Sequence, residues 1–514
     1  MSHAANIPLP DDLADAHRVI RQQQLLIDRM QRQIEQLLRQ RFGPKSEQHH
    51  PEQLPLFGEA VPVPPAPPAP EPKAKSGHGR AKLPAGLPRQ EIVHDLAPDQ
   101  KPCPGCGAER SKIGEEASEQ LEYVPASLRV LVHKRPKYAC AKCQGQVAVA
   151  AKWPEPIERG RPGVGLLAHV IVSKYVDHLP LYRQERIFER QGVRLSRQTT
   201  CGWMAQCAGL LEPIWKGMKT RILQSKVIGT DDTPVPVQDQ DLKGKNRTGR
   251  LWVYLGDREH PFVVYDYTPD RKGAGPESFL REYASGYLQS DAYAGYDRLH
   301  ARGLVEVGCW AHARRKFHEA ISSDQKHAEE AIGWIGRLYG VERSATEEAA
   351  KHWKERGREP AAAERIALED AIRSERRDRE SKEILDGFSK WLEAGVVRAL
   401  PRSPLGEAIN YTRSNWLALN RYLEAPWLSI DNNASERAIR PIAVGRKNWL
   451  HLGSDAGGRT AAILLSVTQS AQGLGVEPWS YLRDVLERVS THPASRLAEL
   501  LPDQWKATRA NGGE

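Results

Sequence analysis

Long apolar runs are absent from this sequence. No stretch approaches the ~18 consecutive apolar residues of a membrane-spanning helix, and the mean hydropathy is −0.58. Met1–Pro10 also lacks the basic-then-apolar pattern of a secretory signal. We therefore expect an intracellular protein without a membrane span. At roughly 150 residues per domain, its 514 residues suggest about three domains.

Cysteine is scarce as well, with 7 residues in 514, which excludes a disulfide scaffold. Two pairs have the spacing Cys-x-x-Cys, at Cys103–Cys106 and Cys140–Cys143. Each pair can chelate one ion from a tight turn, and two pairs complete the tetrahedron that zinc prefers. We predict one structural zinc ion, with a redox dithiol as the alternative. Cys201, Cys207 and Cys309 have no such spacing and are expected to lie in the core.

Acidic residues are in deficit. The chain has 65 Asp and Glu against 74 Lys and Arg, a net charge of +9, and its pI is near 9.1. This excess fits a polyanionic partner such as DNA, and it fits a generic solubilising surface equally well.

The N-terminal segment has the pattern of a coiled coil. Leu13, Ile20, Ile27 and Ile34 fall seven residues apart, which is the spacing of one core position in a heptad repeat. We expect residues 11–42 to join copies of the chain, the alternative being a helix packed on its own protein. The proline-rich stretch at 51–72 follows as a semi-rigid, extended linker.

The region after the cysteine pairs turns helical and predicts a helix-turn-helix. Leu181–Gln191 and Arg197–Leu210 have helical periodicity, and between them Gly192 breaks the helix and Ser196 can cap the next one. Three side chains at the start of the second helix would meet base edges: Arg197, Gln198 and Thr199. Helix pairs joined by glycine are also common in proteins that do not bind DNA.

Strand patterns begin at residue 226 and alternate later with helices. The predicted strands are Lys226–Val237, Leu251–Asp257, Pro261–Tyr267, Gly286–Asp291 and Leu304–Cys309. Helices are predicted at Leu166–Tyr175, Tyr293–Arg302, His312–Ile321, Gly406–Leu423, Ala434–Ile442 and Pro478–Val489. The charged, Ala-rich segment at 325–400 reads as a helical insertion.

Acidic side chains occur at the ends of these elements. Asp231 and Asp232 lie on the first strand and face opposite ways, so only one of them can face a shared site. Asp291 ends a later short strand, and Glu436 lies near a helix start. Such carboxylates can bracket two divalent ions about 3.5–4 Å apart for phosphoryl transfer. Taken singly, each has another interpretation: a cap, a turn residue, or a partner of Arg440.

Read together, these segments resemble the insertion-sequence-66 family of DDE transposases over nearly the whole chain. The blocks that carry the resemblance are Arg41–Glu47, Leu83–Arg89, Asp231–Val235, Ser290–Tyr296, Cys309–Phe317 and Asp431–Pro441. The family usually has Glu after its first catalytic Asp, where this chain has Asp232. The resemblance implies a multi-domain α+β protein: a ribonuclease-H-like α/β core with a helical insertion, a zinc-binding module, a helix-turn-helix and an N-terminal coiled coil.

The expected organisation follows from the patterns and the resemblance together. It comprises a coiled-coil helix (11–47), a Pro-rich linker (48–79), a zinc-binding module (80–155), a helix-turn-helix domain (160–222), a catalytic core (223–322 and 404–470), a helical insertion (323–403) and a C-terminal helical segment (471–514).

The resemblance implies a transposase that binds the terminal inverted repeats of a bacterial insertion sequence. Water would attack the phosphodiester at each element end, and the freed 3′ hydroxyl would then attack target DNA. Carried over residue by residue, catalysis falls on Asp231, Asp291 and Glu436, which would hold two Mg²⁺ or Mn²⁺ ions. The expected DNA-binding residues are Arg197, Gln198, Thr199, His312, Arg315, Asn432 and Arg440.

The expected partners are terminal-repeat and target DNA, further copies of the chain joined through residues 11–42, and the small accessory proteins that such elements encode. We expect a cytoplasmic bacterial protein that is associated with the nucleoid when bound to DNA. Two alternatives remain: a catalytically inactive repressor that binds DNA through its zinc module and helix-turn-helix, and a nuclease of the same fold, such as a resolvase.

Overall fold

The structure is a computed structural model that describes residues 162–239, 245–356, 360–400 and 402–511. It also describes short pieces at 128–138, 148–149 and 155–157 and six helical residues between 17 and 30. The rest of the predicted coiled coil, the linker and the four predicted zinc ligands (Cys103, Cys106, Cys140 and Cys143) lie outside the described residues. Within the described ranges, no helix combines the length and the apolar character that crossing a membrane requires.

The chain divides into two compact units, residues 63–150 and the remainder. In the smaller unit, the described residues include an antiparallel pair of short strands, β1 (Lys137–Tyr138) and β2 (Ala148–Val149). The larger unit contains the sheet and the helices discussed below.

The larger unit is built on a five-stranded mixed sheet with the order β5-β4-β3-β6-β7. The strands are β3 (Val227–Gln238), β4 (Asn246–Leu255), β5 (Val263–Thr268), β6 (Tyr287–Gln289) and β7 (Val305–Val307). The first three pair antiparallel, whereas β6 and β7 run parallel to β3. All five lie where strands were predicted. The order places β3 beside β6, although about 50 residues separate them in the chain.

The two faces of the sheet are covered by different helices. Asp231, Val253 and Tyr265 are cross-strand partners and so share one face. On that face the Tyr265 hydroxyl donates to the Ala438 carbonyl of α13 (Asn433–Trp449). Trp252 lies on the opposite face, against Tyr293 and Tyr296 of the segment around η2 (Ala294–Tyr296), while α5 (Ala274–Phe279) covers Tyr254 there.

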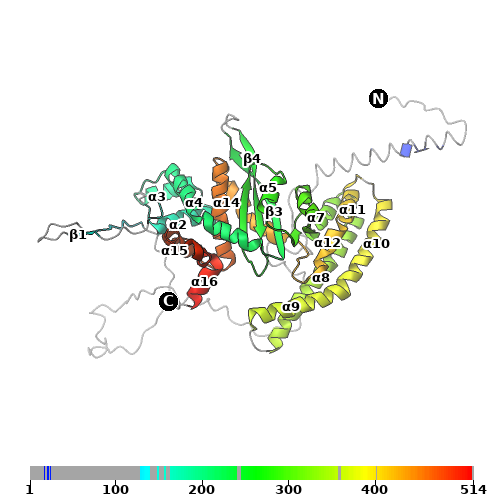
Figure 1. Cartoon of the computed structure of the whole chain (residues 1–514). Helices are drawn as coiled ribbons and strands as arrows, with labels where there is room; N and C mark the ends of the chain where they lie inside the picture. Colours follow the sequence, from blue (N-terminus) through cyan, green and yellow to red (C-terminus); the bar gives the residue numbers. More distant parts are fainter. Residues whose placement is uncertain are drawn as a thin grey trace, which may run out of the picture. The chain divides into compact units, whose positions relative to one another are not determined.

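The edge of the sheet formed by β5 is covered by α14 (Asp455–Gly473). The sequence pattern did not predict this helix. The Ser466 and Ser470 hydroxyls of α14 accept hydrogen bonds from the backbone N–H groups of Tyr265 and Val263 at 2.7 and 3.0 Å. Edge strands leave such backbone groups unpaired, and a covering helix satisfies them. Figure 1 shows α14 in orange between α4 and the sheet.

Within residues 162–239, three helices precede the sheet: α2 (Val164–Tyr175), α3 (Leu181–Arg190) and α4 (Arg197–Ile222). The Ser196 hydroxyl caps α4 by accepting from the Thr199 N–H, as the sequence predicted. The predicted end of α4 at Leu210 was wrong, because the helix continues through Pro213. Its far half buries Leu211, Ile214, Met218 and Ile222, and this burial outweighs the backbone hydrogen bond that Pro213 removes.

The predicted helical insertion is present between the sheet and α13. It consists of α8 (Gln325–Arg356), α9 (Ala362–Arg376), the π-helix η3 (Arg377–Ser381) and α10 (Lys382–Arg398). Arg377 is 2% exposed, pairs with Glu342 at 2.7 Å and donates to the carbonyl oxygens of Ala425 and Leu428. These contacts fasten the insertion to the segment that leads into α13.

The remaining helices complete the two hydrophobic cores, one around the sheet and one around the insertion. They are α6 (Asp297–Ala301), α7 (Trp310–Ala320), α11 (Pro404–Ser414), α12 (Trp416–Asn420), η4 (Arg421–Glu424), α15 (Pro478–Arg488), η5 (Ala494–Leu500) and α16 (Pro502–Asn511). The predicted helix at Ala434–Ile442 corresponds to α13, which runs on through Pro441 to Trp449.

Candidate active site

Asp231 lies in the middle of β3, on the face that α13 covers. Its neighbours on this face both contact α13. A Cβ added at Gly229 would lie 2.8 Å from the Ser435 hydroxyl, and the Arg446 guanidinium donates to the Thr233 hydroxyl at 2.8 Å. The absence of a side chain at position 229 therefore lets the start of α13 approach the strand, and Asp231 lies between the two contacts.

Asp232 points to the opposite face and is neutralised there. Its side chain is 2% exposed, with carboxylate oxygens 2.8 Å from both Arg250 Nη1 and Arg271 Nη2. Buried carboxylates require such partners. Two neighbouring acids thus have different environments: Asp232 has two arginines, and Asp231 faces α13.

Asp291 follows β6, the strand that pairs with β3. Its side chain is 24% exposed, and Arg271 Nη2 lies 3.9 Å from its carboxylate. The next residue, Ala292, has a φ of +61°, so the chain turns sharply away immediately after the acid. Arg271 therefore bridges Asp232 and Asp291, and sequence patterns did not single it out.

Glu436 lies in the first turn of α13 with its side chain 12% exposed. Two side chains of α7 approach it: His312 Nε2 is 3.6 Å from Oε1, and the Arg315 guanidinium Nη2 is 3.6 Å from Oε2. The helix N-terminus is a favourable place for a carboxylate because the helix dipole is positive there.

The charges of the three acids meet at Asp231. The pKa of this carboxyl is raised from 3.8 to about 7, mainly by burial, and the hydrogen bond from the Asp232 N–H opposes the rise. The negative charges of Asp291 and Glu436 contribute to the same rise. The site thus concentrates negative charge at neutral pH, an arrangement typical of cation sites and of catalytic centres.

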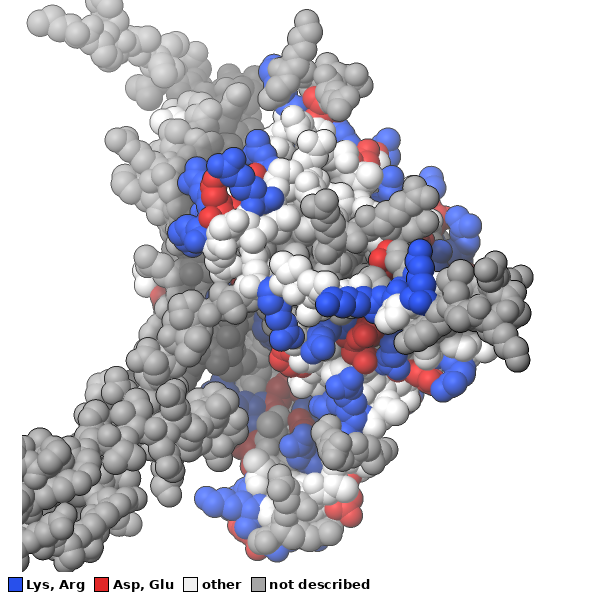
Figure 2. All heavy atoms as spheres, turned by 90° about the vertical axis from the view of Figure 1, so that its left-hand side faces the viewer, with Lys and Arg blue, Asp and Glu red and all other residues white. Residues whose placement is uncertain are grey.

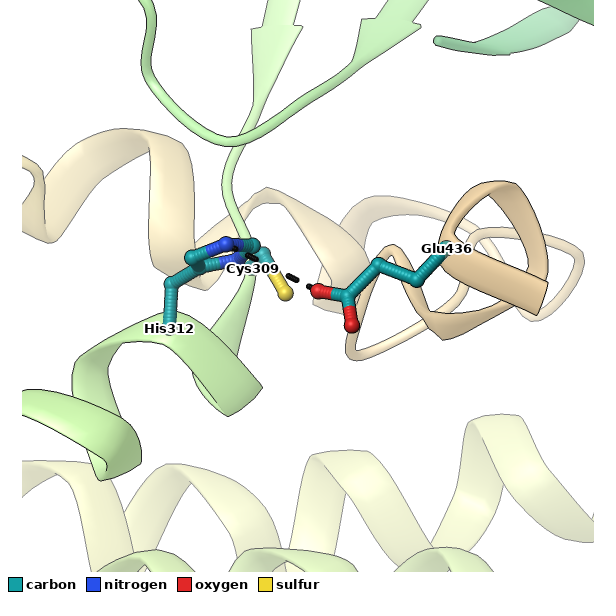
Figure 3. Close-up of side chains that lie close together, drawn as sticks. All are labelled: Cys309, His312 and Glu436. Carbon is teal, nitrogen blue, oxygen red and sulfur yellow. Dashed lines mark ion pairs between the residues drawn. The ribbon is translucent and has the colours of Figure 1, made fainter. Parts of the chain in front are cut away.

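A tight metal-ligand grouping lies beside these acids. Among the described residues, the group of three whose ligand atoms all lie within 4.8 Å of one another is Cys309, His312 and Glu436 (Figure 3). Neither Asp231 nor Asp291 belongs to it. Cys207 and Cys309 are buried, as expected of core residues, but the same prediction for Cys201 was wrong, because this residue is exposed on α4. Cys309 also borders the site. The Cys-x-x-His spacing of Cys309 and His312 was the signal that could have revealed this.

The expected DNA-binding residues fall into two groups. Arg197, Gln198 and Thr199 are exposed at the start of α4, and Arg440 is exposed on α13. Asn432 is 2% exposed, and its amide donates to the Thr230 carbonyl at 2.9 Å and accepts from the Ser435 hydroxyl. Its side chain is therefore occupied by the protein itself.

Basic side chains gather on the side of the molecule where α2 and α3 lie. Figure 2 shows this side, on which Lys and Arg predominate over Asp and Glu. The exposed arginines of α3, the connection after it and the start of α4 are Arg183, Arg186, Arg190, Arg194 and Arg197. A surface of this kind attracts phosphate groups.

Four family models match the chain. The one described as "Transposase IS66 family" matches residues 159–460, more than half of the chain. "Zinc-finger binding domain of transposase IS66" matches 100–144, the segment with both cysteine pairs. "Transposase C of IS166 homeodomain" matches 29–92, and "IS66 C-terminal element" matches 466–502.

Relatives in Sinorhizobium fredii extend over most of the chain. The uncharacterized protein y4hP is 31% identical over 460 residues, which cover 84% of this chain and 78% of the relative. The uncharacterized protein y4qI is 33% identical over 434 residues, covering 81% of this chain and 76% of the relative. The predicted family, and with it a zinc-binding, DNA-binding transposase, is confirmed.

Proposed function

Because this chain belongs to the IS66 transposase family, we propose that it binds the terminal inverted repeats of an insertion sequence and catalyses metal-dependent cleavage and joining of DNA. The observation that carries the proposal is the environment of Asp231. Its carboxyl lies on the α13 face of β3, within reach of the charges of Asp291 and Glu436, which raise its pKa.

The core that holds these acids is proposed to be ribonuclease-H-like. The strand order and directions support this: three antiparallel strands, then two short strands parallel to the first. In this arrangement Asp231 lies on the first strand and Asp291 follows the fourth, its neighbour. α13 packs across the first strand and brings Glu436 to the same side.

The three carboxylates fit divalent ions such as Mg²⁺ or Mn²⁺. Hard oxygen ligands suit these ions, and carboxylates whose charges raise the pKa of Asp231 are stabilised when cations neutralise them. Asp231, Asp291 and Glu436 are the residues that would hold two ions. The chemistry that such a pair supplies is activation of the attacking oxygen and stabilisation of the leaving oxygen.

The surrounding residues position this site. Arg250 and Arg271 neutralise Asp232, which keeps it apart from the reacting groups, and Arg271 also holds the Asp291 end of the site. Asn432 joins the N-terminus of α13 to β3 through a hydrogen bond to the Thr230 carbonyl. This contact fixes the position of Glu436 relative to Asp231. His312 and Arg315 approach Glu436 and are suited to contact a DNA phosphate at the edge of the site.

Recognition of DNA is assigned to the exposed helix pair α3 and α4. Gln198 and Thr199 at the start of α4 would read base edges with Arg197, while the other exposed arginines contact phosphates. We further propose that Cys103, Cys106, Cys140 and Cys143 hold the zinc ion of the matched module and that residues 11–42 join the copies that bind the two element ends.

The decisive experiment uses a labelled terminal-repeat duplex and Mg²⁺. The wild-type protein is expected to cleave at the element end and to join the 3′ end to a target duplex. A protein that binds the repeat without cleaving it would be the inactive repressor, and a protein that cleaves without joining would be the nuclease. Asp291→Asn should retain repeat binding and lose both reactions. Cleavage by Asp291→Asn with Mg²⁺ would refute the site.

A further inference from the structure

One cluster of side chains contains two members that are not ligands of the proposed two-metal site. It consists of Cys309, His312 and Glu436, of which only Glu436 is a proposed ligand of that site. Cys309 ends the loop after β7 and is the N-cap of α7, and His312 lies in the first turn of that helix. Glu436 approaches from α13, 124 residues after His312 in the chain (436 − 312). Figure 3 shows the thiol, the imidazole and the carboxylate converging, with His312 Nε2 3.6 Å from the carboxylate oxygen.

The thiol is 1% exposed and held in a defined orientation. Its sulfur accepts a hydrogen bond of 3.2 Å from the Asn432 N–H and another from the His312 N–H. Two N–H donors and the positive end of α7 stabilise a thiolate, which is the form that binds metal. Burial, together with the charges of Asp431 and Glu436, raises the pKa of the thiol to about 12 and outweighs the lowering effect of the two hydrogen bonds.

One sulfur, one imidazole nitrogen and one carboxylate oxygen make a ligand set with its own selectivity. Thiolate and imidazole favour Zn²⁺ over Mg²⁺, which prefers oxygen ligands only. All three ligand atoms lie within 4.8 Å of one another, so ligand–zinc distances of about 2.0–2.3 Å require only small side-chain movements. The fourth tetrahedral position would remain open.

We propose that Cys309, His312 and Glu436 form a second zinc-binding site, separate from that of the cysteine pairs. Zinc binding breaks the Cys309 S–H bond and releases the proton to solvent, so the thiolate, neutral imidazole and carboxylate all become ligands. Arg315 Nη2 lies 3.6 Å from the other carboxylate oxygen and offsets part of the negative charge of the ligands.

The site shares Glu436 with the proposed catalytic centre. A zinc ion bound to Cys309 and His312 would hold this carboxylate on the α7 side and withdraw it from Asp231 and Asp291. Zinc is therefore expected to inhibit Mg²⁺-dependent cleavage. This consequence, unlike zinc binding itself, rests on the proposed function.

Zinc binding is tested by metal analysis of the full-length protein after dialysis against micromolar Zn²⁺. Wild type should retain about one zinc ion per chain more than Cys309→Ala, and Glu436→Gln should show the same loss. Cys207→Ala is the matched control, because Cys207 is equally buried but lies on α4, outside the cluster. Its zinc content should equal that of wild type.

Cobalt provides a second measurement, made with Cys309 still in place. Full-length protein with Cys103→Ser, Cys106→Ser, Cys140→Ser and Cys143→Ser should still show a thiolate-to-Co²⁺ absorption band, which Glu436→Gln weakens. Equal zinc in wild type, Cys309→Ala and Glu436→Gln, or absence of the cobalt band, would overturn the proposal. Failure of the cleavage assay with the zinc difference intact would instead count against the proposed function.

Discussion

The amide of Asn432 donates a 2.9 Å hydrogen bond to the carbonyl oxygen of Thr230, the residue before Asp231. This single contact joins the N-terminus of α13 to the middle of β3, across 202 residues of sequence. The same side chain accepts from the Ser435 hydroxyl, next to Glu436. The two acids are thus set relative to each other through one buried polar side chain.

Replacing Asn432 should therefore disturb catalysis without removing any acid. We expect Asn432→Ala to leave the Thr230 carbonyl unpaired, to destabilise the protein by about 1–3 kcal/mol, and to lower cleavage more than repeat binding. Urea unfolding and single-turnover cleavage measure the two effects. Asn433→Ala is the control, because that amide bonds to Asp431 rather than to β3. Equal cleavage by the two variants would contradict the positioning role.

The neighbours Asp231 and Asp232 provide a matched pair for the catalytic assignment. Asp231→Asn should reduce cleavage by roughly a hundredfold or more, on the scale of losing a preorganised electrostatic contact. Asp232→Asn removes a partner of Arg250 and Arg271, so its main effect should be on stability. Cleavage rates corrected for the folded fraction distinguish the two. The reverse order of effects would show that Asp232 is the catalytic residue.

Much of this arrangement could be predicted from the sequence because its signals are local. Short strand-like runs, the longer ones rich in β-branched and aromatic residues and bounded by Gly, Pro and Asp, located all five strands, and strand alternation already meant that Asp231 and Asp232 face opposite ways. The predicted helix ends were wrong where the burial of side chains in the folded protein outweighs the local effect of a proline. Pro213 and Pro441 are stop signals in a sequence, yet α4 and α13 continue through them.

Other features could not be read from the sequence because they depend on contacts between distant segments. Arg271 can bridge two acids of the site only because the fold brings it to Asp232 and Asp291. Cys309 has a sequence partner in His312 but no second cysteine at Cys-x-x-Cys spacing, and its relation to Glu436 exists only because α7 and α13 converge. α14 is rich in small residues and was not recognised as a helix, since its role is to cover the edge of β5.

The raised pKa of Asp231 predicts how the stability of the metal-free protein depends on pH. Because its folded-state pKa is about 7 and its ordinary value is 3.8, the folded state holds the proton more tightly. Stability from this group is therefore present below about pH 4 and is lost as the pH rises to about 7. Asp231→Asn should melt at a higher temperature than wild type at pH 8 and at nearly the same temperature at pH 4.

Mg²⁺ should stabilise the wild-type protein at pH 8, as the substitution Asp231→Asn does. By neutralising the acids, it should raise the melting temperature of wild type in a concentration-dependent way. The effect on Asp231→Asn should be smaller. Thermal unfolding with EDTA or with Mg²⁺ measures both. Identical Mg²⁺ responses of the two proteins would mean that Asp231 is not a metal ligand.

The last prediction separates base reading from phosphate contact on the helix pair α3 and α4. Arg190 ends α3 and Gln198 lies in the first turn of α4, and both are exposed. We expect Arg190→Ala to weaken binding to all duplexes alike and to reduce the slope of log affinity against log salt by about one. Gln198→Ala should leave that slope unchanged and weaken the free energy of binding by about 1–3 kcal/mol on the terminal repeat alone, because a base contact carries sequence information.

Arg496→Ala is the control, since this exposed arginine pairs with Glu499 on η5. Fluorescence anisotropy over a range of salt concentrations, with repeat and scrambled duplexes, measures all three. If Gln198→Ala discriminates the repeat from the scrambled duplex as well as wild type does, the start of α4 is not the reading element, and the recognition surface must be sought elsewhere on the basic face.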